Sequence, residues 1–102
     1  MKTKVINIRS APDNWQADPQ YVYIGRAGKG LSGKWGNPFT VAEHGLGRAL
    51  QKYRQWIIQP EQRRLREEAR VQLKGKTLIC FCKDRNGKGP CHGDVLAWLA
   101  DR

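Results

Sequence analysis

The sequence predicts an α/β fold, a small single domain with a mainly parallel sheet of about three or four strands packed by three to four helices. Three observations support this prediction. Short segments rich in β-branched and aromatic residues have the composition of strands, and longer charged segments repeat apolar residues at helical spacing. Helices separate the second strand from the third, and this crossover favours parallel pairing. The length of 102 residues suits one domain, residues 1–102.

The predicted strands are Lys4–Arg9, Tyr21–Gly25 and Thr77–Cys82. Each is apolar and β-branched or aromatic in composition, and turn-forming residues end the first. Residues between the first two strands are expected to form an irregular connection. In the third strand, which we expect to be central in the sheet, alternate side chains share a face, so Cys80 and Cys82 point the same way.

The first predicted helix begins at a capping box, T-x-x-E, formed by Thr40 and Glu43. Apolar residues then follow at helical spacing through Ile57, so one continuous helix is expected. Gly45 and Gly47 weaken its first turns by up to about 1 kcal/mol each.

Two further helices are predicted, Glu61–Leu73 and Gly93–Ala100. Arginines surround the apolar face of the first, a pattern that is typical of a solvated helix with ion pairs. The second is mostly apolar and is expected to pack against the sheet, with Trp98 at the edge of its buried face. Its start is expected to lie beside the carboxyl end of the third strand.

The composition indicates a basic protein with an anionic partner. The formal net charge is +10, which in a domain of this size favours a nucleotide or a nucleic acid as partner. No apolar run approaches the ~20 residues of a membrane span, and no signal-peptide core follows the N-terminus. We therefore expect a cytoplasmic location and no membrane association. Three cysteines, an odd number, exclude a complete disulfide framework.

The segment Arg26–Asn37 is rich in glycine and lysine and has no acidic residue. Its backbone N–H groups, together with Arg26 and Lys34, have the chemistry that binds a phosphate. Trp35 would stack on a base, Asn37 would hydrogen-bond the same ligand, and Cys82 would also line the ligand site. The pattern matches neither the Walker loop nor the dinucleotide fingerprint, and an ordinary connecting loop is the alternative interpretation.

A second cluster comprises Cys80, Cys82, Cys91 and His92. One interpretation is a zinc site, because four cysteine and histidine ligands are the usual set of a structural zinc, although the spacing is not that of a zinc knuckle. Another is structural, with Cys80 as a small buried apolar residue and His92 as a helix cap. The sequence leaves both interpretations open.

The third interpretation of this cluster is catalytic. Cys91 lies at the predicted start of a helix, where the dipole lowers the pKa of a thiol, and His92 or Asp94 would also act at the reacting atom. Adjacent residues rarely meet within a helix, so the base for Cys91 is also sought elsewhere. If the second and third strands are parallel neighbours, the basic segment and this cluster face one pocket.

Several motifs together resemble one family, the uncharacterised domain of unknown function 4326 of bacteria and phages. They are Val22–Arg26, Trp35–Phe39, Lys52–Arg54, Leu78–Cys82 and Cys91–Leu96. The resemblance runs from about Lys4 to Leu99 and implies a single small cytoplasmic domain, without implying an activity. Asp84 to Lys88 makes one loop longer and more basic than expected for the family, so no metal-ligand spacing carries over.

These observations favour a domain that binds a nucleotide or a nucleic-acid phosphate through its basic glycine-rich segment, next to the cysteine and histidine cluster. An enzyme that processes nucleotides or nucleic acids is the first hypothesis. A non-catalytic nucleic-acid-binding or phage-type interaction protein is the alternative, because the net charge alone accounts for such binding. A zinc-stabilised structural module is the second alternative.

Overall fold

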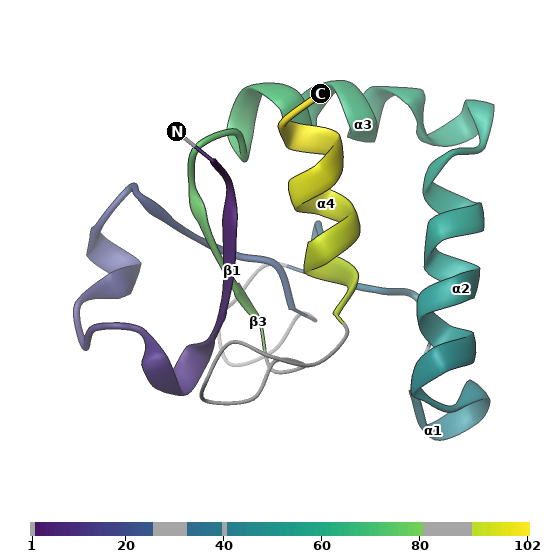
Figure 1. Cartoon of the computed structure of the whole chain (residues 1–102), viewed down its shortest axis with the longest axis horizontal. Helices are drawn as coiled ribbons and strands as arrows, with labels where there is room; N and C mark the ends of the chain where they lie inside the picture. Colours follow the sequence, from purple (N-terminus) through teal and green to yellow (C-terminus); the bar gives the residue numbers. More distant parts are fainter. Residues whose placement is uncertain (1, 26–32, 40, 81–90) are drawn as a thin grey trace.

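The computed structural model describes residues 2–25, 33–39, 41–80 and 91–102, and Figure 1 shows their arrangement. The elements in chain order are β1 (Lys4–Asn7), η1 (Ile8–Ser10), η2 (Trp15–Ala17), β2 (Tyr21–Tyr23), α1 (Val41–His44), α2 (Leu46–Ile57), η3 (Pro60–Gln62), α3 (Arg63–Gln72), β3 (Thr77–Cys80) and α4 (His92–Ala100). The fold is a small mixed α/β structure, as the sequence predicts.

The three strands form one parallel sheet in the order β1-β3-β2. Val5 and Val22 both lie in register with Leu78 of the central strand. The central strand, β3, is thus the last of the three strands in the chain. It pairs in parallel with both β1 and β2, which confirms the predicted parallel pairing. Leu78, Ile79 and Cys80 are fully buried, as expected of the central strand of a sheet that is covered on both faces.

Helix α4 is the element that joins the sheet to the other helices. It packs against β1 and β3 and also contacts α2 and α3. Figure 1 shows α4 between the sheet and α2, with α3 crossing one end of both helices. The core forms where these elements meet, and its largest fully buried members include Tyr53, Ile57, Leu73 and Leu96.

The first two strands are shorter than predicted. β1 ends at Asn7, because its side-chain oxygen accepts a hydrogen bond from the backbone N–H of Arg9 at 2.7 Å and caps a 3₁₀ turn. β2 ends at Tyr23, although the N–H of Ile24 still donates to the carbonyl of Ile79 at 2.9 Å. The prediction that both strands run two residues further was therefore wrong.

The helix predicted from the capping box is two helices. α1 ends at His44, and Gly45 follows with φ of 76°, a left-handed conformation that a helix cannot contain. The carbonyl of Gly45 accepts the first bond of α2 from the N–H of Ala49 at 2.9 Å. Thr40, the capping residue proposed from the sequence, lies outside the described residues.

The two remaining helices start at other residues than predicted. η3 begins at Pro60, and α3 begins only at Arg63 and ends one residue before the predicted Leu73. α4 begins at His92 rather than at Gly93. No helix in the described part of the chain is long and apolar enough to cross a membrane.

Candidate functional site

Cys91 is the N-cap residue of α4. It is extended, with φ of −151° and ψ of 146°, and its sulfur accepts a hydrogen bond from the backbone N–H of Gly93 at 3.3 Å. In return, Oδ2 of Asp94 accepts from the N–H of Cys91 at 3.2 Å, which completes a capping box with a thiol in the place of the usual hydroxyl. The sulfur thus lies at the positive end of the helix dipole.

Gly93 is the residue that lets α4 start this close to the sheet. A Cβ atom at position 93 would lie 2.6 Å from Cδ1 of Ile24 and 2.8 Å from Cγ1 of Val5. A side chain at this position would therefore force the side chains of Ile24 and Val5 to shift. The close approach brings Cys91 and His92 to the carboxyl ends of the strands, where parallel sheets place their ligands.

The side chains of Cys91 and His92 meet, although they are neighbours in the chain. Sγ of Cys91 lies 3.7 Å from Nδ1 of His92. The sequence argument assumed that both residues are helical, which would direct their side chains apart. Because Cys91 is an extended N-cap and His92 is the first helical residue, the two side chains instead turn toward each other.

A backbone carbonyl sets the protonation of His92. Nε2 lies 2.6 Å from the carbonyl oxygen of Ile24, which can only accept a hydrogen bond. Nε2 therefore carries the proton, and in the neutral ring Nδ1 presents its lone pair toward the thiol of Cys91. The imidazole is buried, with 4% of its surface exposed, so this orientation is fixed by packing as well as by the hydrogen bond.

Tyr53 of α2 forms one wall of the site. Its ring meets the imidazole of His92 edge to face, with centroids 5.3 Å apart, and its hydroxyl donates to the carbonyl of Trp35 at 3.4 Å. Burial raises the pKa of Tyr53, and the nearby Cys91 raises it further. Tyr53 therefore remains a neutral donor. Tyr53 is one of the residues at helical spacing before Ile57, but that spacing did not indicate a contact with His92.

Cys80, at the end of β3, lies directly behind Cys91. The two sulfurs are 2.9 Å apart, both residues are buried, and no disulfide joins them. The thiol of Cys80 also donates to the carbonyl of Ile6 at 3.8 Å. The structure thus brings together three of the four clustered residues, while Cys82 lies outside the described residues.

The arrangement of these residues departs from that of a zinc site. Two thiolates on one tetrahedral zinc ion are about 3.8 Å apart, given Zn–S bonds of about 2.3 Å. The sulfurs of Cys80 and Cys91 are closer than this, at 2.9 Å. Within residues 2–25, 33–39, 41–80 and 91–102, no group of three or more histidine, cysteine or acidic residues could hold a metal ion.

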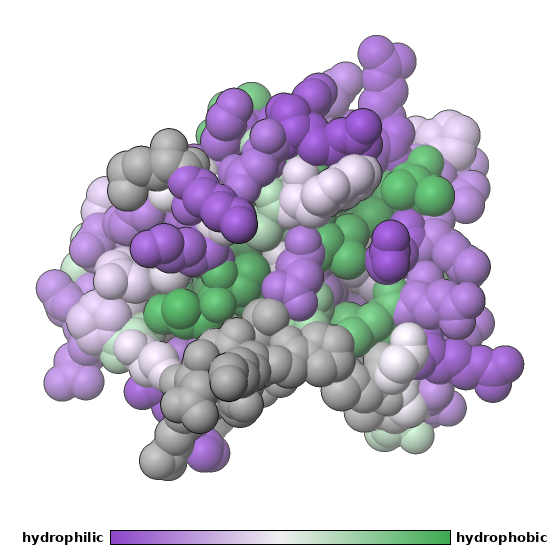
Figure 2. Space-filling view, in the orientation of Figure 1, coloured by the Kyte–Doolittle hydropathy of each residue, from purple (hydrophilic) through white to green (hydrophobic). Residues whose placement is uncertain are grey.

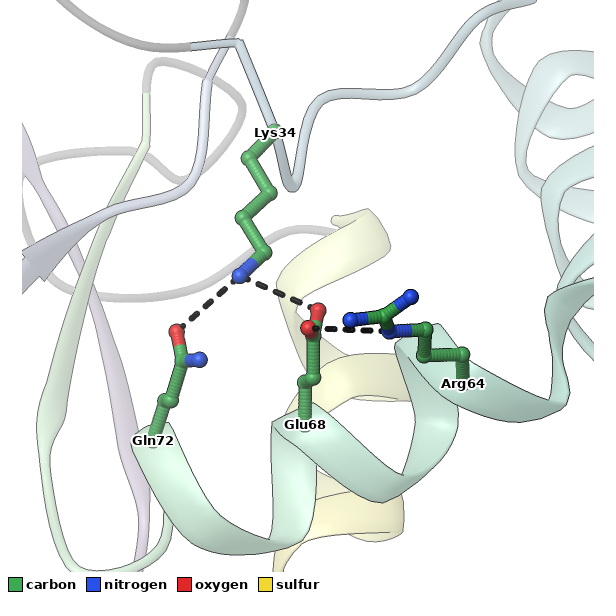
Figure 3. A network of polar contacts seen from close by, with 4 residues as sticks. All are labelled: Lys34, Arg64, Glu68 and Gln72. Carbon is green, nitrogen blue, oxygen red and sulfur yellow. Dashed lines mark hydrogen bonds and ion pairs between the residues drawn. The ribbon is translucent and has the colours of Figure 1, made fainter.

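The end of the basic segment is bound to the protein itself. Nζ of Lys34 lies 3.0 Å from a carboxylate oxygen of Glu68 and 3.2 Å from the amide oxygen of Gln72, and Arg64 contacts the same carboxylate at 3.8 Å (Figure 3). The cation of Lys34 is thus paired with α3. Arg26, the other cation proposed for phosphate binding, lies outside the described residues.

Trp35 belongs to the same buried core as Cys91, and Asn37 is hydrogen-bonded to α2. Trp35 is only 5% exposed, and its ring lies 4.9 Å from Nζ of Lys34. Asn37 donates from Nδ2 to the carbonyl of Ala49 at 3.1 Å and accepts from the N–H of Phe39 at 2.9 Å. The contacts of both residues fasten this segment to α2.

A groove of about 830 Å³ lies between α2 and α4 and has Cys91 and Asp94 in its wall. Its other lining residues include Leu50, Arg54, Val95 and Trp98. Figure 2 shows hydrophobic surface between these two helices, bordered by hydrophilic side chains. Trp98 is 55% exposed, so it is the tryptophan of this site that can meet a ligand. The sequence placed Trp98 at the edge of a helix face, but it did not predict the groove.

Comparison with known proteins gives one match. No curated protein and no solved structure matches the chain. The model of one family, described as a domain of unknown function, matches residues 6–102, which includes every described element except the first two residues of β1. Nearly the whole chain is therefore covered, and the protein belongs to the domain of unknown function family DUF4326.

Proposed function

We propose that this protein is a small thiol-dependent enzyme that acts on a nucleotide, with Cys91 as the nucleophile and His92 as its base. The observation that carries the proposal is the position of the Cys91 sulfur. It lies 3.7 Å from Nδ1 of His92, accepts the N–H of Gly93 at the start of α4, and belongs to the wall of the groove. The sulfur of Cys91 therefore lies next to a base, a donor that can stabilise its anion, and a groove that can hold a substrate.

The proposed chemistry uses the lone pair on Nδ1 of His92. The thiol proton of Cys91 passes to Nδ1, and the N–H of Gly93 and the helix dipole stabilise the thiolate. The thiolate forms a bond to an electrophilic carbon of the substrate as the bond to the leaving group breaks. The imidazolium then returns its proton to the leaving group. A water molecule that gives a proton to the neutral His92 next attacks the same carbon, the carbon–sulfur bond breaks, and the thiolate of Cys91 takes the proton back from His92. The carbonyl of Ile24 holds the ring in place throughout.

A nucleotide suits the groove for two reasons. The exposed ring of Trp98 can stack on a base, an interaction worth about 1–3 kcal/mol. The guanidinium of Arg102 lies 4.3 Å from the centre of that ring, so one face already stacks on a planar group of the protein. Arg54 in the groove wall and the overall charge of +10 favour the phosphate of the same ligand.

The remaining predicted residues have supporting roles in this proposal. The carboxylate of Asp94 accepts a hydrogen bond from the N–H of Cys91 and so holds the thiol in position. Lys34, Trp35 and Asn37 fasten the chain beside Tyr53, which contacts the ring of His92. Phosphate binding by the basic segment that starts at Arg26 is still a prediction.

The test combines a turnover assay with a measurement of thiol protection. A panel of ribo- and deoxyribonucleotides is incubated with the protein, and products are separated by chromatography. Cys91→Ser is expected to abolish turnover and to leave the fold intact, because serine is a good N-cap residue. Adenosine monophosphate is expected to slow the alkylation of Cys91 by iodoacetamide.

Two results would contradict the proposal. One is wild-type turnover by the Cys91→Ser variant. The other is a protein that turns over no nucleotide and whose Cys91 is alkylated at the same rate with and without nucleotide. Protection without turnover would instead support a non-catalytic nucleotide-binding domain, the alternative that the net charge favours.

A further inference from the structure

Two thiols that are not joined by a disulfide lie in contact in the core of this protein. Sγ of Cys80 and Sγ of Cys91 are 2.9 Å apart, and the two residues come from different elements, the end of β3 and the N-cap of α4. A disulfide bond has a length of about 2.05 Å, so a movement of less than about 1 Å joins the sulfurs. Nothing in the thiolate chemistry proposed above uses Cys80.

We propose that Cys80 and Cys91 form a redox-active dithiol, which a peroxide oxidises reversibly to an intramolecular disulfide. The pair is independent of the proposed nucleotide chemistry, although it shares Cys91 with it. Cys91 belongs to the groove wall and is 3% exposed, whereas Cys80 is fully buried behind it. A small oxidant that enters the groove therefore reaches Cys91 first.

The oxidation proceeds in two balanced steps. The thiolate of Cys91 attacks one oxygen of hydrogen peroxide, the O–O bond breaks, and the products are a sulfenic acid on Cys91 and one water once the released hydroxide takes the thiol proton. The sulfur of Cys80 then attacks the sulfenic sulfur, the S–O bond breaks, and a second water leaves with the proton of Cys80. Two thiols and one peroxide thus become one disulfide and two waters.

The surroundings favour both steps. Nδ1 of His92 at 3.7 Å accepts the proton of Cys91, and the N–H of Gly93 at 3.3 Å stabilises the thiolate that attacks peroxide. Cys80 at 2.9 Å is already in position for the second step, which is faster than further oxidation when the resolving thiol is in contact. The product links β3 to α4 and removes the thiol of Cys91.

The decisive protein is the Cys82→Ser variant, because Cys80 and Cys91 are then its two cysteines. The folded variant is treated with hydrogen peroxide, and its mass and free thiols are measured after denaturation. The expected result is an intact mass lower by about 2 Da, a fall from two free thiols to none, and full reversal by dithiothreitol. Wild-type protein is expected to lose two of its three thiols under the same conditions.

Each other outcome overturns the proposal. It fails if the variant keeps both thiols, gains the mass of sulfinic or sulfonic acid, or forms a disulfide-linked dimer. A Cys80→Ser variant adds a second check, since Cys91 in it is expected to accumulate oxygen adducts instead of a disulfide. The nucleotide proposal can fail while this one holds, because disulfide formation is read from mass and thiol count without any turnover assay.

Discussion

Both ring nitrogens of His92 have a defined partner, and the two partners differ in kind. The carbonyl of Ile24 at Nε2 can only accept, while the thiol of Cys91 at Nδ1 can donate. The first contact therefore sets the tautomer that the second one needs. This is why the same side chain joins the end of β2 to the start of α4 and also acts on the thiol.

Two substitutions of His92 separate these roles. In His92→Gln, the amide can still donate to Ile24 but no base faces Cys91, so we expect alkylation of Cys91 by iodoacetamide at pH 7 to slow by roughly tenfold. In His92→Ala, the buried carbonyl of Ile24 also loses its donor, at an added cost of about 1–3 kcal/mol in the free energy of unfolding. Alkylation kinetics and urea denaturation measure the two effects. Equal alkylation rates in wild type and His92→Gln would show that His92 is only structural.

At the scale of elements, the break between α1 and α2 is set by one backbone conformation. Gly45 has φ of 76° and ψ of 158°, and nothing lies within 4 Å of a Cβ atom built at this position. The requirement for glycine at this position is therefore conformational and not steric. Two positions later, Gly47 lies inside α2, and a Cβ atom there also has open space.

Alanine at these two glycines is expected to have opposite effects. Gly45→Ala forces a side chain into a left-handed conformation and is expected to lower the free energy of unfolding by about 1–2 kcal/mol. Gly47→Ala improves helix propensity and is expected to raise it by up to about 1 kcal/mol. Thermal or urea unfolding of the two variants measures both changes in the free energy of unfolding. A loss of stability in both variants would contradict the conformational explanation.

The positions of the strands and of the longer helices were predictable from local sequence patterns. The residues at which these elements begin and end were not. Alternation and β-branching locate β1, β2 and β3, and helical spacing locates α2 and α3. Whether Asn7 caps a turn or continues a strand depends on one side-chain hydrogen bond, to the N–H of Arg9. The left-handed conformation of Gly45 likewise belongs to the break between α1 and α2, which the helical spacing of the sequence did not indicate.

The position of Cys91 and His92 near the carboxyl ends of the strands was predictable, but their contacts were not. Parallel pairing of β2 with β3 places their carboxyl ends together, and this is the reason that Ile24 and His92 meet. The contact between Cys91 and His92 depends on the extended N-cap conformation, and the groove beside Trp98 depends on the packing of α2 against α4. Both are tertiary features, so the sequence could give only the residue types.

At the scale of the whole molecule, the two ends of the chain are tied together through Thr3. Its hydroxyl donates to a carboxylate oxygen of Asp101 at 2.6 Å and accepts from the N–H of Gly75 at 2.9 Å. The turn before β3, the residue before β1 and the residue after α4 therefore share one buried hydroxyl. β1 and β3 are neighbours in the sheet and α4 packs on both, so this tie holds the end opposite to the Cys91 site.

The tie predicts a dependence of stability on pH. The hydrogen bond from the side chain of Thr3 is the main cause that lowers the pKa of Asp101 below its usual value of 3.8, with smaller contributions from the backbone N–H of Thr3 and from nearby lysines. A carboxyl whose pKa is lower in the folded state stabilises the fold above its unfolded pKa. That contribution is lost as the pH falls below about 3.8 and through the folded value.

Asp101→Asn is therefore expected to unfold at a lower temperature than wild type at pH 7, and the difference in melting temperature should shrink as the pH falls from 5 toward 2. Asp13→Asn removes the same charge at an exposed residue and serves as the control, because it separates the local contact from the change in net charge. Thermal unfolding across this pH range measures both variants. If Asp101→Asn and Asp13→Asn shift the melting temperature equally at every pH, the carboxylate acts only through its charge, and the Thr3 hydroxyl does not hold the chain ends together.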